Sequence, residues 1–269
     1  MERVMSKSTV ICIISAHRKQ GKTQLVMRLV KALTDEGFEV GTVKHIGEES
    51  TFEDKRIKDT YRHAEAGAKL VVAVTKSELI TIERIEEPSI ENAIAKFPKT
   101  FDFIIVEGFK KSPHSRFIII DKAEEFVGLN EAGQILGITG YIAADESEIA
   151  KLEDKYPVLN EQDVDGFLSI MKSERAKTLI AKLPLMNCGD CGFSTCQEMA
   201  EQLMQKKTSF NKCPHLTAQT FLQVDDEQIQ MKDFVQNIIS QGIEGMLQTL
   251  KGVPRNPKKI VIQIEHENL

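Results

Sequence analysis

Short apolar runs rich in β-branched residues alternate with longer amphipathic stretches along the first part of the chain. This alternation is typical of strand–helix units that wind a mostly parallel sheet. The runs are continuously apolar, as expected for strands that helices cover on both faces. The predicted strands are Thr9–Ser15, Glu39–Lys44, Ala68–Val74, Phe101–Glu107, Phe117–Asp121 and Gln134–Ile142.

Apolar residues recur at helical spacing between these runs. Leu25, Leu29 and Leu33 repeat along one side of a stretch that ends at Gly37, a residue type that commonly terminates helices. Ser89 stands where the N-terminal cap of a further helix is expected. Together the strands and helices predict an α/β domain over residues 1–175. The predicted helices are Thr23–Glu36, Ile90–Lys96 and Gln162–Lys172.

The composition changes in the last third of the chain. Cysteine, glycine and proline replace the strand pattern after Pro184, which predicts a small cysteine-rich domain over residues 180–218. The last part, residues 225–269, carries apolar residues along one side of a long helix candidate, Asp226–Leu250. It ends with Lys259–Glu265, whose alternation of apolar and polar residues predicts an exposed or edge strand.

Charge and apolar run length bear on partners and location. Forty acidic residues against 35 basic ones give a net charge of −5, which argues against nucleic-acid binding through a general electrostatic field. Apolar runs such as Val10–Ile14 are far shorter than the roughly 20 residues of a membrane-spanning helix. The N-terminus shows neither an apolar signal core nor a cleavage site. We therefore expect a cytoplasmic protein that binds neither nucleic acid nor membranes.

A phosphate-binding loop is predicted where the first strand meets the first helix. The loop reads AHRKQGKT over residues 16–23, in the strand–loop–helix context of a Walker A motif. In such loops backbone N–H groups and the positive end of the helix converge on phosphate oxygens. Lys22 would then bind the outer phosphates and Thr23 the magnesium ion. Gly21 would let the backbone approach the phosphates closely, because it has no side chain.

The loop departs from the motif at its first residue. Ala16 stands where the motif has its first glycine, so a positive φ there would cost roughly 1–2 kcal/mol. Lys19, Gln20 and Gln24 are predicted to contact the nucleotide as well. For Lys19 the alternative is a solvated loop charge.

A second acidic group is needed at the end of a neighbouring strand, to hold the water shell of the magnesium ion. Glu107 ends the predicted strand Phe101–Glu107, whereas Asp102 near its start would lie about 17 Å away along an extended strand. We therefore assign Glu107 to the metal and expect Asp102 to cap or solvate the opposite edge. Lys22 and Glu107 are the predicted catalytic residues, and Thr23 and Glu107 the predicted magnesium ligands.

Four segments together resemble one protein family. The loop at residues 16–23, VGTVKH at 40–45, KDTYRHAEAGA at 58–68 and DFIIVEGFK at 102–110 resemble, in this order, the molybdopterin-guanine dinucleotide biosynthesis protein B (MobB) family. The resemblance covers roughly residues 9–170 and is far more specific than a Walker A motif alone. It implies a GTP-binding P-loop protein with slow intrinsic hydrolysis, usually a homodimer. It also implies a role in assisting the guanylyltransferase that attaches GMP to molybdopterin.

The resemblance also implies further site residues. Lys44, His45 and Arg62 would face the same crevice as the phosphate-binding loop. For Arg62 the alternative is a surface residue paired with Glu65. The NKxD signature of many GTPases is absent, so the preference for GTP rests on the resemblance. Asp145 is a candidate partner for guanine, with a plain helix cap as its alternative.

A four-cysteine segment is the second chemical signal. Its pattern is Cys188-x2-Cys191-x4-Cys196-x16-Cys213-Pro214, with a predicted helix Gln197–Lys206 before the last ligand. Four thiolates complete the ligation of one cubane cluster. The segment resembles the small [4Fe–4S] domain of corrinoid iron–sulfur proteins. Structural zinc is the rival interpretation, while the fifth cysteine, Cys12, is expected in the core of the first strand.

The leading hypothesis combines the two signals. It is a GTP-binding, MobB-like protein that assists molybdenum or tungsten cofactor maturation, with Mg²⁺ at its loop and a [4Fe–4S] cluster attached. The expected partners are the molybdenum cofactor guanylyltransferase and an iron–sulfur client enzyme. An alternative is a redox or metallocentre-maturation NTPase, in which hydrolysis gates electron transfer from the cluster. A third is a scaffold in which loop and cluster are both structural.

Overall fold

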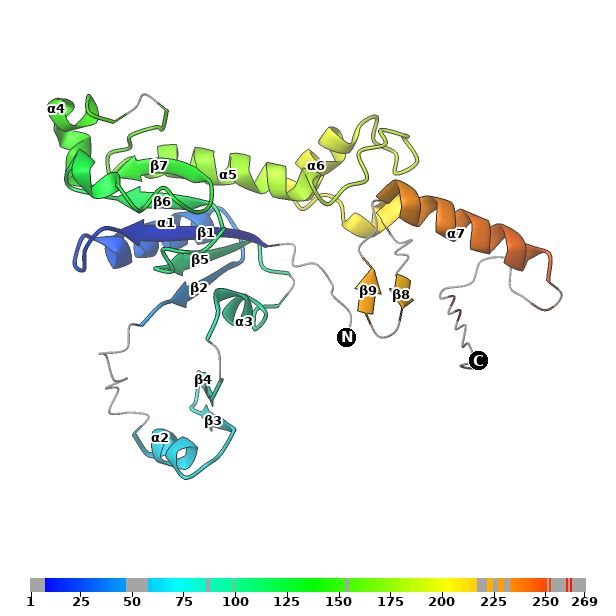
Figure 1. Ribbon diagram of the computed structural model, residues 1–269, viewed down its shortest axis with the longest axis horizontal. Coiled ribbons are helices and arrows are strands. Elements are labelled where there is room, and N and C mark those ends of the chain that lie inside the picture. The colour runs from blue at the N-terminus through cyan, green and yellow to red at the C-terminus, as the bar shows by residue number, and fades with distance from the viewer. Residues whose placement is uncertain are drawn as a thin grey trace. The chain divides into compact units, whose positions relative to one another are not determined.

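A computed structural model gives the arrangement of most of the chain (Figure 1). It describes residues 8–46, 58–85, 88–98, 100–152, 155–216, 222–224, 227–229 and 233–250, with residues 252, 260 and 262. The chain divides into two compact units, Met1–Thr178 and Leu179–Leu269. No helix in these ranges is both long and apolar enough to cross a bilayer.

Five parallel strands form the sheet of the first unit, in the order β2–β5–β1–β6–β7. The α/β class predicted from the hydrophobic pattern is therefore confirmed. Because all strands run in one direction, their carboxyl ends meet at one edge, where Lys44 pairs in register with Glu107 and Ser15 with Ile119. The strands are β1 (Thr9–Ser15), β2 (Val40–Lys44), β5 (Phe103–Glu107), β6 (Arg116–Ile119) and β7 (Ile135–Thr139).

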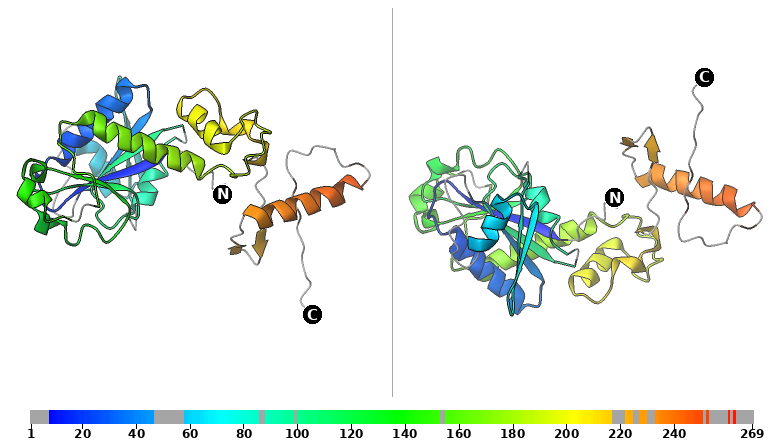
Figure 2. Two further views of the ribbon diagram at one scale, coloured as in Figure 1. Left: turned by 90° about the horizontal axis from the view of Figure 1, so that it is seen from above. Right: turned by 90° about the horizontal axis from the view of Figure 1, so that it is seen from below.

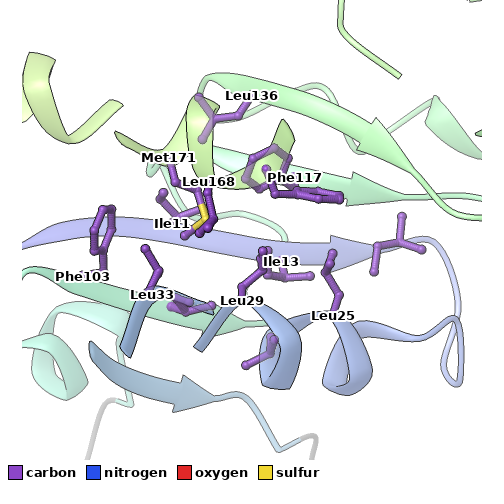
Figure 3. Close-up of a cluster of buried hydrophobic side chains, with 14 residues drawn as sticks. Ile11, Ile13, Leu25, Leu29, Leu33, Phe103, Phe117, Leu136, Leu168 and Met171 are labelled. Atoms are coloured by element: carbon purple, nitrogen blue, oxygen red, sulfur yellow. The ribbon is translucent and has the colours of Figure 1, made fainter. Parts of the chain in front are cut away.

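Hydrophobic clusters cover both faces of this sheet. Ile11 and Ile13 of β1 pack in one cluster with Leu29 of helix α1 (Lys22–Asp35) and Met171 of helix α5 (Val164–Ile180), as Figure 3 shows. The alternate residues of the same strands, including Cys12, pack in a second cluster with residues from the other connections. Burial on both faces explains why the strands read as continuous apolar runs. It also confirms Cys12 as a core residue, fully buried in β1.

Helices and short turns connect the strands of the first unit. Ser89 caps α3 as expected, because its side chain accepts a hydrogen bond from the Asn92 N–H at 3.1 Å. The helix predicted over Gln162–Lys172 continues as far as Ile180. The helical elements are α1 (Lys22–Asp35), α2 (Lys58–Glu65), α3 (Ile90–Ile94), η2 (Ala123–Phe126), η3 (Tyr141–Ala144), α4 (Glu146–Ile149) and α5 (Val164–Ile180).

A separate hairpin corrects one strand prediction. The run Ala68–Val74 contains β3 (Leu70–Val74), which pairs antiparallel with β4 (Leu79–Glu83) and not with the main sheet. The pattern missed β4, and it could not separate the hairpin from a central strand because the run is continuously apolar. In the structure one face of the hairpin is exposed: Val72 and Val74 are 48% and 76% accessible.

The second unit has its own small core. Leu179, Leu183 and Met199 pack there with three of the four clustered cysteines. Its elements are α6 (Cys196–Met204), η4 (Phe210–Lys212), η5 (Pro214–Leu216), β8 (Leu222–Val224), β9 (Glu227–Ile229) and α7 (Asp233–Gln248), which is orange in Figures 1 and 2.

The C-terminal prediction needs one correction. The long helix was expected from Asp226, but it begins at Asp233 because residues 227–229 pair with β8 in a short hairpin. The predicted strand Lys259–Glu265 lies outside the described residues, except for Ile260 and Ile262.

A buried ion pair closes the edge of the sheet opposite the loop. Asp102 precedes β5 and pairs with Arg175 of α5, and both side chains are 6% exposed. Asp102 also accepts from the Glu39 N–H at 2.9 Å, and its carbonyl accepts from Arg175 Nη1 at 2.6 Å. Asp102 therefore caps this edge, as expected, but it is buried and not solvated.

Asp102→Ala would leave the Arg175 guanidinium buried without its counter-charge. We expect the free energy of unfolding of the first unit to fall by about 3–5 kcal/mol, the usual loss when one partner of a buried pair is removed. Lys31→Ala is the matched control, since Lys31 and Asp35 form an exposed pair on α1 and its loss is worth about 0.5 kcal/mol or less. Urea unfolding followed by circular dichroism measures both, and equal losses would contradict this role.

Candidate nucleotide site and cysteine cluster

The carboxyl edge of the sheet gathers the predicted site residues. β1 ends at Ser15 and α1 begins at Lys22, so residues 16–21 form the loop between them. β5 and β2 end beside it with Glu107 and Lys44. Open α/β sheets bind ligands at this edge.

Backbone conformation sets the shape of the loop. Gly21 has φ +82°, and a side chain there would approach the Glu161 carboxylate at 3.3 Å, so both conformation and space favour glycine. Lys19 is also left-handed, with φ 66°. Ala16 does not take a positive φ, so the cost considered for this residue does not arise. Lys19 and Gln24 are exposed.

Lys22 lies across the loop. Its Nζ donates to Ser15 Oγ at 2.5 Å and to the His17 carbonyl at 3.2 Å. Burial lowers the pKa of Lys22 from its ordinary value, and the positive charges of Lys110 and Lys44 lower it further, while Glu107 acts in the opposite direction. The ammonium therefore stands among other cations and would gain from an anion.

Thr23, Glu107 and Lys44 meet in direct contact. Thr23 Oγ1 lies 2.9 and 3.0 Å from the two carboxylate oxygens of Glu107. Lys44 Nζ lies 3.3 Å from Glu107 Oε1 and 3.3 Å from Thr23 Oγ1. A hydroxyl and a carboxylate side by side offer the hard oxygen donors that Mg²⁺ prefers, so these residues fit the ion. The structure thus brings together three residues that are 21 to 84 positions apart in sequence.

His45 follows β2 and is held by the backbone of β5. Its N–H donates to the Glu107 carbonyl at 2.9 Å, and its ring lies 4.7 Å from that of Phe109. Gly108 must be glycine here, because its φ is +99° and a Cβ would approach the His45 Cβ at 2.8 Å. The structure therefore places exposed His45 beside Glu107.

Gln20 connects the loop to two acidic residues that the sequence analysis missed. Its Oε1 accepts from the His17 N–H at 2.7 Å, and its Nε2 donates to Asp121 at 3.1 Å and to Glu125 at 2.8 Å. Asp121 follows β6, so its place at the same edge could have been inferred from the parallel strand order. The structure gives Gln20 a role in shaping the loop.

Lys110 and Arg116 were also missed. Lys110 Nζ donates to the Ala16 carbonyl at 2.8 Å, at the start of the loop. Arg116 is fully buried in β6, and its guanidinium donates to the carbonyls of Lys110 (2.7 Å) and Ser112. This buried cation fixes the segment that carries Lys110. Long charged side chains are rarely buried, so the sequence did not suggest an interior position for Arg116.

Two further candidates have local partners. Arg62 pairs with Asp59 on its own helix α2 at 3.3 Å, and the structure itself does not place it at the loop. Asp145 caps α4: its Oδ1 accepts from the N–H groups of Ser147 and Glu148 at 3.0 and 3.2 Å. Its geometry is therefore that of the plain cap.

The four clustered cysteines lie in the second unit. Cys191, Cys196 and Cys213 are buried, and Cys188 is exposed. The Cys196 N–H donates to Asn187 Oδ1 at 2.8 Å, which ties the start of α6 to the turn before the first cysteine. Gly189 and Gly192 both have φ +83° and permit the tight turns that follow two of the thiols.

The surroundings of Cys213 suit a thiolate ligand. Burial raises the pKa of its thiol, and so do the neighbouring thiols of Cys191 and Cys188. The backbone N–H groups of His215 and Leu216 donate to its sulfur and act in the opposite direction. Hydrogen bonds of this kind stabilise metal-bound thiolates, so the donor set fits an iron–sulfur cluster.

Comparison with known proteins identifies both segments. Residues 10–139 match the family model of molybdopterin guanine dinucleotide synthesis protein B (MobB). Residues 183–215, which contain all four clustered cysteines, match a second family model described as "Putative Fe-S cluster". The first matched segment contains the loop with Lys22 and Thr23, and also Glu107.

Two curated relatives extend this finding. A protein of Methanocaldococcus jannaschii named "Putative molybdopterin-guanine dinucleotide biosynthesis adapter protein" is 26% identical over 258 residues, which are 95% of this chain and 97% of that protein. A Bacillus subtilis protein named "Probable molybdopterin-guanine dinucleotide biosynthesis adapter protein" is 29% identical over 167 residues, 59% of this chain and 91% of its own. The alignment with the archaeal relative therefore extends beyond residues 10–139.

Solved MobB structures are also similar to this chain. The Bacillus subtilis MobB structure is 19% identical, with a TM-score of 0.47, and covers 60% of this chain and 96% of its own. A homologue from Bacillus stearothermophilus is 22% identical with a TM-score of 0.47, covering 62% of this chain and 98% of its own.

Proposed function

We propose that this chain is a GTP-binding adapter in the synthesis of the guanine dinucleotide form of the molybdenum or tungsten cofactor, with a [4Fe–4S] cluster on its second unit. The main support for this proposal is the contact of Thr23, Glu107 and Lys44 beside the loop with Lys22. It brings the parts of a nucleoside-triphosphate site together at one edge of the sheet. The match to the MobB family model and the names of the two curated relatives support the pathway.

The loop residues have distinct tasks in this proposal. Gly21 and the N-terminus of α1 would bind the phosphates. Lys22 would give up its hydrogen bonds to Ser15 and His17 and donate to outer phosphate oxygens instead. Thr23 and Glu107 would hold Mg²⁺, which neutralises charge between the phosphates when bound. Lys44 contacts Glu107 and compensates its charge. Because Glu107 is paired with Lys44, its carboxylate is better suited to hold the metal ion than to accept a proton as a general base. This agrees with slow hydrolysis.

Removing the Lys22 ammonium tests the nucleotide site. In Lys22→Met we expect the Kd for GTP with Mg²⁺ to rise about 10- to 100-fold, because charge-assisted hydrogen bonds contribute about 1.5–3 kcal/mol. Lys31→Met is the control, since Lys31 belongs to the same helix and pairs with Asp35 on its exposed side. Titration calorimetry with GTP and ATP gives both affinities. Unchanged GTP binding in Lys22→Met would contradict the phosphate role, and tighter ATP binding by the natural protein would contradict guanine selectivity.

The spacing of the cysteines along the chain supports a cluster over zinc. Structural zinc sites with four cysteines are commonly built from two close cysteine pairs, whereas only Cys188 and Cys191 form a C-x2-C pair here. Four thiolates can complete the ligation of one cubane cluster, with one sulfur on each iron.

Removing a buried ligand tests the cluster. Anaerobically purified protein should contain about four iron and four sulfide per chain, and Cys196→Ser should lose most of both because a buried thiolate has left the set. Cys12→Ala is the control: this thiol is buried in β1 of the first unit and should leave the iron content unchanged. Zinc at one equivalent without sulfide would contradict the cluster.

The adapter role requires partners. We propose the cofactor guanylyltransferase as the partner of the first unit, an iron–sulfur client for the second unit, and a homodimer as the assembly. The exposed apolar face of β3 and β4, with Leu70, Val72, Val74 and Leu79, supports a contact between copies. Light scattering should therefore give twice the 30.2 kDa of one chain. A mass of 30.2 kDa at micromolar concentration would contradict the dimer.

An energised electron donor is the second candidate. The exposure of Cys188 favours it, because one ligand of the cluster reaches the surface through which an electron would leave. Faster cluster reduction or oxidation on addition of nucleoside triphosphate and Mg²⁺, without binding to a guanylyltransferase, would support this candidate against the adapter.

A further inference from the structure

The four cysteines do not have equivalent surroundings. Cys191, Cys196 and Cys213 are 8%, 7% and 3% exposed and belong to the small core of the second unit. Cys188 is exposed, on the turn between Asn187 and Gly189, both of which have positive φ. A cluster held by this set would therefore have three enclosed corners and one corner near solvent.

Two other potential ligands stand beside that outer corner. The sulfur of Cys188, a carboxylate oxygen of Asp190 and a ring nitrogen of His215 all lie within 4.8 Å of one another. His215 Nε2 lies 2.7 Å from Asp190 Oδ2. Asp190 comes from the turn between the first two cysteines and His215 from η5, directly after the last one. In the described part of the chain, this is the one such group of three.

The chemistry of both side chains suits iron. Imidazole replaces thiolate on one iron of Rieske clusters, and carboxylates are iron ligands in non-haem sites. The turn has room to adjust, since a Cβ at Gly189 would meet nothing within 4 Å. The three buried cysteines have no comparable group of substitutes among the described residues.

We propose that Asp190 and His215 are alternative ligands for the iron bound by Cys188, so that this corner keeps its iron when the thiolate leaves. The exchange changes no oxidation state: the bond from iron to the Cys188 sulfur breaks, the electron pair stays on the sulfur, and the thiolate takes a proton from solvent. A carboxylate oxygen or a neutral imidazole nitrogen then donates its own pair to the iron. This rests on the proposed cluster. It makes the exposed corner the exchangeable one, whereas loss of a buried ligand would open the cluster.

Iron counting on the full chain tests the exchange. Cys188→Ala should retain about four irons per chain, whereas Cys188→Ala combined with Asp190→Ala and His215→Ala should retain about three. The EPR signal of an oxidised three-iron cluster should appear in the triple variant and be absent from Cys188→Ala. A Cys188→Ala protein with three irons or none overturns the proposal.

A second measurement does not depend on the stability of Cys188→Ala. Asp190→Ala/His215→Ala keeps all four cysteines, and mild oxidation should convert it to the three-iron form at least about threefold faster than the natural protein. Equal rates overturn the proposal. A natural protein with four irons followed by either negative result refutes the alternative ligands alone, whereas a natural protein without iron refutes the cluster itself.

Discussion

The contact between the Glu107 carboxylate and Thr23 Oγ1 is the interaction on which the nucleotide site depends. It joins the last residue of β5 to the first turn of α1 at 2.9 Å, with Lys44 of β2 on the same carboxylate. This contact requires parallel neighbouring strands, because only then do their carboxyl ends reach one edge. The buried Asp102–Arg175 pair holds the opposite edge of the same strand. One strand is thus fixed at both ends.

The loop itself is shaped by residues from distant parts of the chain. Gln20 bridges to Asp121 and Glu125, about 100 positions away, and Lys110 contacts the Ala16 carbonyl from the segment held by Arg116. Burial lowers the pKa of Lys22, and the positive charges of Lys110 and Lys44 lower it further, whereas Glu107 opposes the shift. Three lysines gathered beside one loop suit the binding of phosphate.

Local sequence patterns predicted the elements that form the site. β1 has the predicted ends, because its residues are buried on both faces and a loop with glycine follows. The strand–loop–helix pattern and the last residue of a strand indicated Thr23 and Glu107 as magnesium ligands, and the structure brings the two side chains into contact. The role of Gln20 in holding Glu125, and the burial of Arg116, depend on long-range packing that no local pattern records. For the same reason, β3 was placed in the main sheet although it pairs with β4.

The most direct test of the central contact is a crystal structure of the protein with Mg²⁺ and a non-hydrolysable GTP analogue. We predict phosphates along residues 16–23 with Lys22 on the outer ones, and the metal ion between Thr23 and Glu107. A triphosphate bound elsewhere, with Thr23 still in contact with Glu107 and Lys22 still on Ser15 and His17, would contradict it.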